Sequence, residues 1–290
     1  MQVLVTGVSG FSGSFVARAL ASAGHDVTGL FRRETNFLAQ ARKQANIRLE
    51  QAGLDSVGGL AGPFEAIVHT AATSPAPGIT DAMIVRDNLD GTTALLAEAG
   101  RWGTERFVFF SSLSLYGDVT APLLDEETAI VNPDIYGASK RQCELLVSGS
   151  GIPSLSLRLP GVLGPGAHRN WLSGIATKLK ARKTIRAFHL DSPFNNAVHI
   201  DDIARLVSTV LAHSWTDFDA VVLGARGALP VRRVIESLAQ GLGVTAQIEP
   251  APATKSSFIL SSHRAIARWG YDPMEIGEMA ERYGREIRLS

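Results

Sequence analysis

Short apolar runs alternate with longer helical stretches through the first 160 residues of the chain. Most of the runs are continuously apolar, which is typical of parallel strands covered on both faces. The stretches between them are long enough for crossover helices, so the pattern predicts βαβ units and a doubly wound sheet. The predicted strands are Gln2–Thr6, Asp26–Phe31, Ile47–Gln51, Ala66–Thr70, Arg106–Ser111 and Ser154–Leu159, and the predicted helices are Phe11–Ala23, Thr80–Arg101 and Tyr136–Ser148.

The pattern changes after Leu159. A stretch rich in Pro and Gly, 160–166, interrupts it before further helical and apolar segments follow. We predict an α/β fold with a Rossmann-type doubly wound parallel sheet in residues 1–165, to which 197–225 return. Residues 166–196 and 226–290 are predicted to form a small discontinuous C-terminal substrate lobe. Its expected elements are Trp171–Ala181, Pro230–Gly241, Ser262–Trp269 and Ile276–Ile287, with Ala197–His213 and Ala220–Gly224 returning to the core.

Composition and charge narrow the class of protein. The chain has 290 residues, 45% of them hydrophobic, which is enough material for a sizeable core. Its 28 Lys and Arg residues balance its 28 Asp and Glu residues. A nucleic-acid or membrane-surface binder needs an excess of positive charge, so we expect neither kind of partner.

Cysteine usage and hydropathy indicate the compartment. Cys143 is the single cysteine, so no intramolecular disulfide forms, and no Cys/His cluster has the spacing of zinc ligands. We therefore expect no metal ion. No apolar run reaches the ~18 residues of a spanning helix, and the N-terminus is predicted to be a strand rather than a signal peptide. These observations favour a soluble, cytoplasmic protein.

A glycine-rich turn joins the first strand to the first helix. In Thr6–Gly13, Gly7 permits the tight turn, Gly10 lets the backbone approach a pyrophosphate, and Gly13 allows close helix–strand packing. The following helix offers unpaired N–H groups and the positive end of its dipole to phosphates. The position of the turn, between strand and helix, predicts a dinucleotide cofactor.

The end of the second strand bears on which dinucleotide binds. An NAD site usually has a carboxylate there, which binds the ribose hydroxyls. In this chain Arg32 and Arg33 follow Phe31, and two guanidinium groups suit a 2′-phosphate. The sequence therefore predicts NADP(H) as the preferred cofactor. NAD(H) stays possible if both arginines are ordinary surface charges.

Candidate catalytic residues lie at a strand end and on the next helix. Tyr136 and Lys140 are four apart, on one face of a predicted helix. The free pKa of a tyrosine is ~10, and a neighbouring ammonium lowers it by stabilising the phenolate. Ser111 and Ser112 end the fifth strand, at the edge of the sheet where such folds bind ligands. A serine hydroxyl there, together with Tyr136 and Lys140, predicts acid–base chemistry on a carbonyl or an alcohol.

These residues carry a resemblance that extends over nearly the whole chain. It resembles the extended short-chain dehydrogenase/reductases, also called the NAD-dependent epimerase/dehydratase family. The matching segments are Thr6–Gly13, His69–Ala72, Asn88, Ser111–Gly117, Tyr136–Lys140, Arg158–Gly166 and Val198–Asp202. The resemblance implies that Ser112, Tyr136 and Lys140 are catalytic, that Lys140 also binds the nicotinamide ribose, and that the chain forms a homodimer through helices Thr80–Arg101 and Tyr136–Ser148.

The resemblance also implies the binding residues. Cofactor contacts are expected from Gly7, Ser9, Gly10, Phe11, Ser12, Gly13, Arg32, Arg33, Leu54, Thr70, Ala71, Ala72, Tyr136, Lys140, Pro160 and Val162. Substrate contacts are expected from Ser112, Ser114, Asn170, Trp171 and Leu172.

The family covers several reactions, and the residues favour some of them. Its 4,6-dehydratases carry Asp-Glu where this chain has Leu113 and Ser114, which disfavours dehydration. The glycine- and proline-rich stretch followed by Asn170 resembles nucleotide-sugar 4-ketoreductases, our leading hypothesis. However, Asn195 stands where many nucleotide-sugar epimerases have a diphosphate-binding Arg, although Arg169 offers a substitute. The alternatives are a nucleotide-sugar 4-epimerase, a reductase or dehydrogenase of a non-nucleotide sugar or small ketone, and a non-catalytic NADP(H)-binding regulatory protein.

Overall fold

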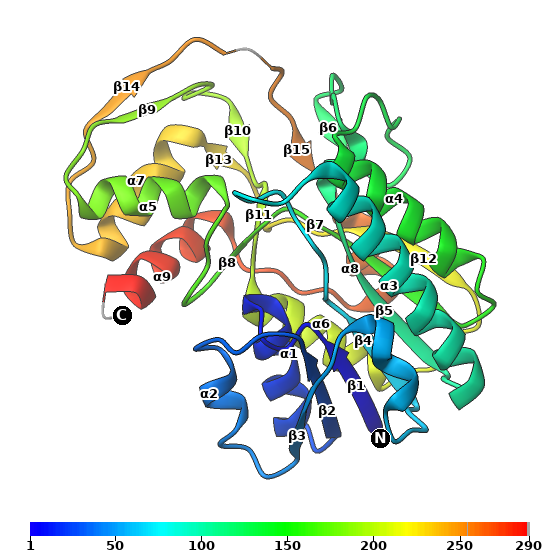
Figure 1. Cartoon of the computed structure of the whole chain (residues 1–290). Helices are drawn as coiled ribbons and strands as arrows, with labels where there is room; N and C mark the ends of the chain where they lie inside the picture. The colour runs from blue at the N-terminus through cyan, green and yellow to red at the C-terminus, as the bar shows by residue number, and fades with distance from the viewer. Residues whose placement is uncertain (254, 289–290) are drawn as a thin grey trace. The chain divides into compact units, whose positions relative to one another are not determined.

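A seven-stranded sheet forms the centre of the first of two compact units in the computed structural model, which describes residues 1–253 and 255–288 (Figure 1). The strand order is β12-β7-β5-β4-β1-β2-β3, and the pairs of β1 with β2 and β4, β2 with β3, and β4 with β5 are parallel. The predicted Rossmann-type α/β fold is confirmed. The strands are β1 Gln2–Thr6, β2 Asp26–Phe31, β3 Ile47–Gln51, β4 Ala66–His69, β5 Arg106–Ser112, β7 Ser154–Leu159 and β12 Phe218–Val222.

Helices cover the sheet because its strands are apolar on both faces. Val3, Leu4 and Val5 are consecutive in β1, yet all three are fully buried. Helix α1 (Phe11–Ser22) contacts β1, β2 and β3, whereas α3 (Asp81–Trp102) lies beside α4 (Ile135–Ser148) (Figure 1). The remaining helical elements here are α2 Leu38–Ala41, the 3₁₀ turns η1 Leu54–Gly59 and η2 Leu113–Tyr116, and most of α6 Ile200–Leu211.

The second unit comprises residues 118–129, 159–203 and 222–290, so a segment from the middle of the predicted core packs with this unit. Helices α5 (Trp171–Lys180), α7 (Val231–Leu242) and α9 (Ile276–Arg288) bury a common apolar core. Among the described residues, no helix of either unit has the length and apolar character of a membrane span. The smaller elements are α8 His263–Trp269, β6 Leu123–Leu124, β8 Gly161–Leu163, β9 Ile185–Ala187, β10 Pro193–Phe194, β11 Ala197–His199, β13 Leu229–Pro230, β14 Ile248–Pro250 and β15 Ile259–Leu260.

Two glycines allow α7 and α9 to approach each other closely. A Cβ on Gly241 would lie 2.0 Å from the Glu281 carbonyl oxygen, and a Cβ on Gly284 would lie 2.5 Å from the Leu238 carbonyl oxygen. Both contacts are to backbone, which does not move aside as a flexible side chain does. The helix pair therefore depends on the absence of side chains at these two positions.

We expect Gly284→Ala to lower the free energy of unfolding by about 2 kcal/mol, because the added methyl forces α7 and α9 apart. Gly174→Ala in α5 is the matched control, since its Cβ would meet no atom within 4 Å. Removing a helical glycine there should raise stability by about 0.5–1 kcal/mol. Urea unfolding followed by circular dichroism measures both, and equal stability of the two variants would contradict the packing argument.

Candidate active site

The glycine-rich turn packs closely against itself and the segment after β4 because its glycines have no side chains. A Cβ on Gly13 would lie 2.4 Å from the Gly7 carbonyl oxygen and 2.6 Å from Thr70 Oγ1, and a Cβ on Gly7 would lie 2.8 Å from Ala71 Cα. Gly10 is the N-cap of α1, so no side chain caps the first N–H groups of that helix. These groups and the positive end of the dipole fit the pyrophosphate of a dinucleotide.

The end of β2 carries the two predicted arginines. Arg32 Nη1 lies 3.6 Å from Asp87 Oδ2 of α3, and Arg33 is exposed. Burial raises the pKa of Asp87, but hydrogen bonds and nearby cations, Arg32 among them, outweigh burial and hold that pKa below its usual value. The next acid, Glu34, pairs with Arg42 at 2.6 Å. Arg32 is thus partly neutralised by a carboxylate that the sequence analysis did not single out.

Five further predicted cofactor residues belong to the first unit: Ser9, Phe11, Ser12, Leu54 and Ala72. The Ser9 carbonyl accepts a hydrogen bond from Thr35 Oγ1 at 2.7 Å, which ties the loop after β2 to the glycine-rich turn. Phe11 is buried, with its ring 5.3 Å from that of Phe15. A Cβ on Gly91 of α3 would lie 2.7 Å from Leu54 Cδ1, so Leu54 packs closely on that helix. Their contacts with a cofactor stay predictions.

The structure brings Ser112 and Tyr136 together. Ser112 ends β5, and its side chain lies near enough to that of Tyr136, in the first turn of α4, to oppose the rise that burial causes in the Tyr136 pKa. The glycine after Tyr136 explains this approach: a Cβ on Gly137 would lie 2.1 Å from the Ser114 carbonyl oxygen, so α4 begins directly against η2. The Ser112 hydroxyl also donates to Ser114 Oγ at 3.2 Å. The side chains of Ser112 and Tyr136, two predicted catalytic residues, therefore lie near each other.

Lys140 lies one helical turn after Tyr136 and is buried, with Nζ 4.1 Å from the centre of the Phe109 ring. Burial lowers its pKa to about 8, while Cys143 and Glu144 oppose the fall. Burial raises the pKa of Tyr136 to about 12, and the Ser112 side chain opposes that rise. The direction for Tyr136 is opposite to the predicted lowering, because burial dominates. At neutral pH the Tyr136 hydroxyl holds its proton and Lys140 is charged.

The other predicted residues lie in the second unit: Pro160, Val162, Asn170, Trp171 and Leu172. Asn170 caps α5, with Oδ1 accepting from Ser173 N at 2.8 Å and Nδ2 donating to the Val162 carbonyl at 2.9 Å. The Trp171 ring lies 5.3 Å from that of Phe194, and Leu172 is buried in the helix core. The side chains of Asn170 and Leu172 thus hold the second unit together, and their predicted substrate contacts stay predictions.

A cavity of about 420 Å³ lies within the second unit. The loop of residues 166–170, one face of α5, and Tyr283 and Ile287 of α9 line it. Arg169 and Lys180 bring positive charge to its wall, and Asn170 borders it as well. The cavity is therefore suited to an anionic or polar ligand.

Asn195 occupies the position where the resemblance leads us to expect a diphosphate-binding arginine. It is buried, its Oδ1 accepts from Leu260 N at 2.7 Å, and its Nδ2 donates to the Leu260 carbonyl at 2.9 Å. This pair of hydrogen bonds holds β15 in place. The Asn195 amide is thus occupied by structural hydrogen bonds and brings no charge to the second unit.

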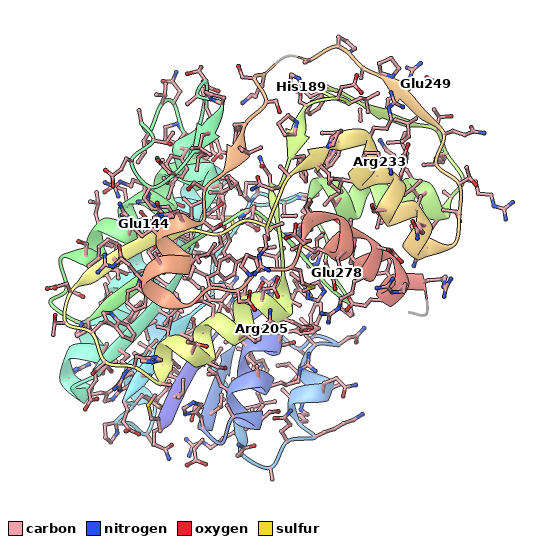
Figure 2. The ribbon with its side chains drawn as sticks, turned by 180° about the vertical axis from the view of Figure 1, so that it is seen from behind. Glu144, His189, Arg205, Arg233, Glu249 and Glu278 are labelled. Carbon is pink, nitrogen blue, oxygen red and sulfur yellow. The ribbon has the colours of Figure 1, made fainter. Side chains whose placement is uncertain are left out.

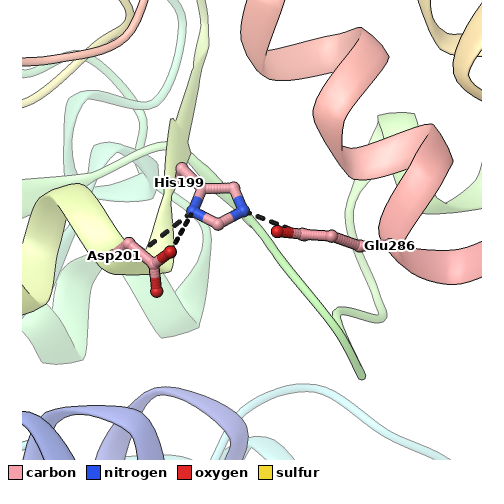
Figure 3. Close-up of side chains that lie close together, drawn as sticks. All are labelled: His199, Asp201 and Glu286. Atoms are coloured by element: carbon pink, nitrogen blue, oxygen red, sulfur yellow. Dashed lines mark hydrogen bonds and ion pairs between the residues drawn. The ribbon is translucent and has the colours of Figure 1, made fainter.

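A cluster of His199, Asp201 and Glu286 lies in the second unit (Figure 3). His199 Nε2 lies 3.1 Å from Glu286 Oε2, and Nδ1 accepts from the Asp201 backbone N–H at 3.2 Å. Arg282 bonds to both carboxylates, to Asp201 through Nη2 and to Glu286 through Nε at 2.8 Å. Arg282 therefore supplies the positive charge that the two carboxylates need, and the cluster joins α9 to the start of α6.

Comparison with known proteins places this site among related enzymes. The model of the NAD dependent epimerase/dehydratase family matches residues 3–224. The chain is 26% identical over 303 residues to UDP-glucose 4-epimerase of Corynebacterium glutamicum, covering 94% of this chain and 91% of that protein. It is 32% identical over 231 residues to dTDP-glucose 4,6-dehydratase of Streptomyces niveus, covering 73% and 69%.

The fold has close structural counterparts. The crystal structure of UDP-glucuronic acid 4-epimerase from Bacillus cereus in complex with NAD superposes with a TM-score of 0.84 at 18% identity, covering 100% of this chain and 97% of that one. The chain belongs to the NAD-dependent epimerase/dehydratase family and is an enzyme of the extended short-chain dehydrogenase/reductase type.

Proposed function

We propose that this enzyme is an NAD(P)-dependent oxidoreductase that reduces or forms a carbonyl group of a nucleotide sugar, as a 4-ketoreductase. The observation that carries the proposal is the placement of Ser112 at the end of β5 against the first turn of α4, where it acts on Tyr136, with Lys140 one turn further along α4. Ser112 is at the end of β5, the edge at which folds of this kind bind their ligands.

In the proposed reaction the chain's residues orient the substrate and supply the proton. Gly7, Gly13 and the N-terminus of α1 would hold the cofactor, which supplies or accepts a hydride when bound. Ser112 donates a hydrogen bond to the substrate oxygen, and Tyr136 transfers its proton to that oxygen during reduction. Because its pKa is raised to about 12, Tyr136 is fully protonated before reduction. The Lys140 ammonium then stabilises the phenolate that remains.

The nucleotide-sugar class is supported by the relatives and by the second unit. UDP-glucose 4-epimerase and dTDP-glucose 4,6-dehydratase are named for nucleotide-sugar substrates. Arg169 and Lys180 at the cavity of the second unit offer positive charge to a diphosphate. A side-chain hydroxyl at Ser114, where a dehydratase needs a carboxylic acid, disfavours dehydration here.

Two other functions have support from specific observations. A 4-epimerase uses the same Ser112, Tyr136 and Lys140, and a 4-epimerase is among the relatives. A reductase of a non-nucleotide sugar or small ketone is favoured by Asn195, whose amide is bonded to Leu260 where a diphosphate clamp needs a cation. Net cofactor turnover separates the first from a reductase, because an epimerase consumes no cofactor. Calorimetric titration with UDP and dTDP separates the second from a nucleotide-sugar enzyme, because an enzyme with a non-nucleotide substrate should bind neither diphosphate.

Tyr136→Phe should lower kcat at least about 100-fold while leaving the Kd for the cofactor unchanged, because it removes only the transferred proton. The assay follows NAD(P)H absorbance with a panel of 4-keto nucleotide sugars and small ketones, and calorimetry measures cofactor binding. Tyr271→Phe is the matched control, since its hydroxyl donates to the Gly224 carbonyl and should leave kcat within about twofold. Retained activity in Tyr136→Phe would remove Tyr136 from the mechanism.

We also propose NADP(H) as the preferred cofactor, because Arg32 and Arg33 follow β2 and the nearest acid in sequence, Glu34, is paired with Arg42. Arg33→Ala should then raise the Kd for NADPH roughly tenfold, the loss of one charge-assisted hydrogen bond. The Kd for NADH should stay constant, since NADH lacks the 2′-phosphate. Equal affinity of the unaltered enzyme for NADPH and NADH in calorimetric titrations would refute this preference.

The predicted homodimer is proposed to form through α3 and α4. Leu145 and Leu146 on α4 are 48% and 37% exposed, although large apolar side chains usually lie inside. Leu145→Glu should convert the dimer to a monomer, because it brings a charge into an apolar contact. Sedimentation velocity measures the mass of both proteins, and a monomeric unaltered protein would contradict the proposal.

A further inference from the structure

A buried ion pair joins Glu144 of α4, one turn after Lys140, to Arg158 of β7. Glu144 has no exposed surface, and Arg158 of β7 binds both of its oxygens, with Nε at 3.1 Å from Oε1 and Nη2 at 2.9 Å from Oε2 (Glu144 is labelled in Figure 2). Ser156 Oγ donates to Oε1 at 2.8 Å, and Arg141 Nη1 lies 3.3 Å from Oε2. Arg158 Nη1 in turn donates to the Tyr116 hydroxyl at 2.7 Å.

This pair keeps Glu144 ionised. Burial alone would raise the pKa of Glu144, but the hydrogen bonds and the charge of Arg158, with the hydrogen bond from Ser156, outweigh burial and hold the pKa below its usual value. The pKa of Arg158 is raised by the same contacts, although burial opposes the rise. A fixed negative charge therefore exists inside the first unit at every working pH.

Apart from the Glu144–Arg158 ion pair, the groups that act on Lys140 are neutral. Burial, with Lys140 adding to the effect, lowers the pKa of His69 to about 3, so the His69 imidazole is neutral. Burial raises the pKa of Cys143, so its thiol stays protonated. Tyr136 is protonated too, and the Phe109 ring offers only its π face. Among the described residues that influence Lys140, Glu144 is thus the one with a negative charge.

We propose that Glu144, fixed by Arg158, is a positioning residue that keeps the buried Lys140 amine in its ammonium form beside Tyr136. The inference rests on the proposed function, in which the Lys140 ammonium stabilises the Tyr136 phenolate. Burial favours the neutral amine of Lys140, and the carboxylate one turn away counters it. A neutral Lys140 does not stabilise the phenolate that remains after Tyr136 gives up its proton. Glu144 touches neither substrate nor cofactor in this proposal and acts only through Lys140.

The test measures the protonation of Lys140 directly. The full-length protein is labelled with [13C]lysine, and the Cε resonance of Lys140, identified by its loss in Lys140→Met, is followed against pH. Glu144→Gln should move the midpoint down by about 1 pH unit or more, because a nearby opposite charge is lost. The alkaline limb of the pH–rate profile should move down by the same amount.

Further variants keep the test decisive if Glu144→Gln fails to fold, since it leaves the Arg158 charge buried without a partner. Glu144→Gln/Arg158→Met removes both charges and should show a smaller fall in the midpoint, because the repulsion between Arg158 and Lys140 is lost together with the attraction of Glu144. Glu144→Asp keeps the charge and should restore the midpoint, and Ser156→Ala, which removes one hydrogen bond but no charge, should leave it unchanged. A folded double variant with the midpoint of the unaltered protein would overturn the inference.

The two proposals fail in different ways. A fall in the Lys140 midpoint with an unmoved pH–rate profile supports the action of Glu144 on Lys140 and counts against the catalytic use of Lys140. An unmoved midpoint overturns the role of Glu144 even if Tyr136→Phe abolishes turnover. The nuclear magnetic resonance titration needs no substrate, so it gives its answer whichever carbonyl compound the enzyme reduces.

Discussion

At the carboxyl edge of the first unit's sheet, neighbouring backbone segments lie in direct contact because glycines stand between them. The positions of the candidate site residues depend on these close contacts. Atoms of neighbouring segments already lie where Gly7, Gly13 and Gly137 would carry a Cβ. The first two bring β1, α1 and the segment after β4 together, and the third brings α4 onto the turn that follows β5. Main-chain packing is stiffer than side-chain packing, so Ser112 and Tyr136 are held by the fold itself rather than by adjustable rotamers.

The second constraint is the burial of charge beneath that edge. A buried lysine tends to lose its proton, and a buried carboxylate tends to gain one. In this unit the two tendencies are countered together, because Arg158 stabilises the carboxylate of Glu144 and Glu144 stabilises the ammonium of Lys140. Removing one partner of a buried ion pair costs about 3–5 kcal/mol, because the other charge is left uncompensated. Neither Glu144 nor Arg158 can therefore be replaced alone without loss of stability, and the same pair sets the charge near Lys140.

The sequence predicted the long elements well, because each carries its own pattern. The bounds of β1 (Gln2–Thr6) and β7 (Ser154–Leu159) were predicted to the residue, since breakers adjoin these strands: Gly7 follows β1, and Pro153 and Pro160 flank β7. The two-residue strands β6 and β15 have no such pattern, and only their pairing across 135 residues or more makes them strands, which also draws residues 118–129 into the second unit. Glu144 was missed because an acid on a helix is usually solvated. Its spacing of four from Lys140 was the available signal.

Under the proposed function, the second unit would constrain the substrate in a way that the family resemblance alone does not. With Asn195 bonded to Leu260, the segment before β11 offers an amide already in use rather than a guanidinium. If the substrate carries a diphosphate, its charge must be met largely from the loop before α5, where Arg169 adopts a left-handed conformation (φ 59°) next to the capping Asn170. A loop that depends on a strained residue tolerates fewer shapes than a strand does. Selectivity among nucleotide sugars, or against them, should therefore reside in residues 166–170.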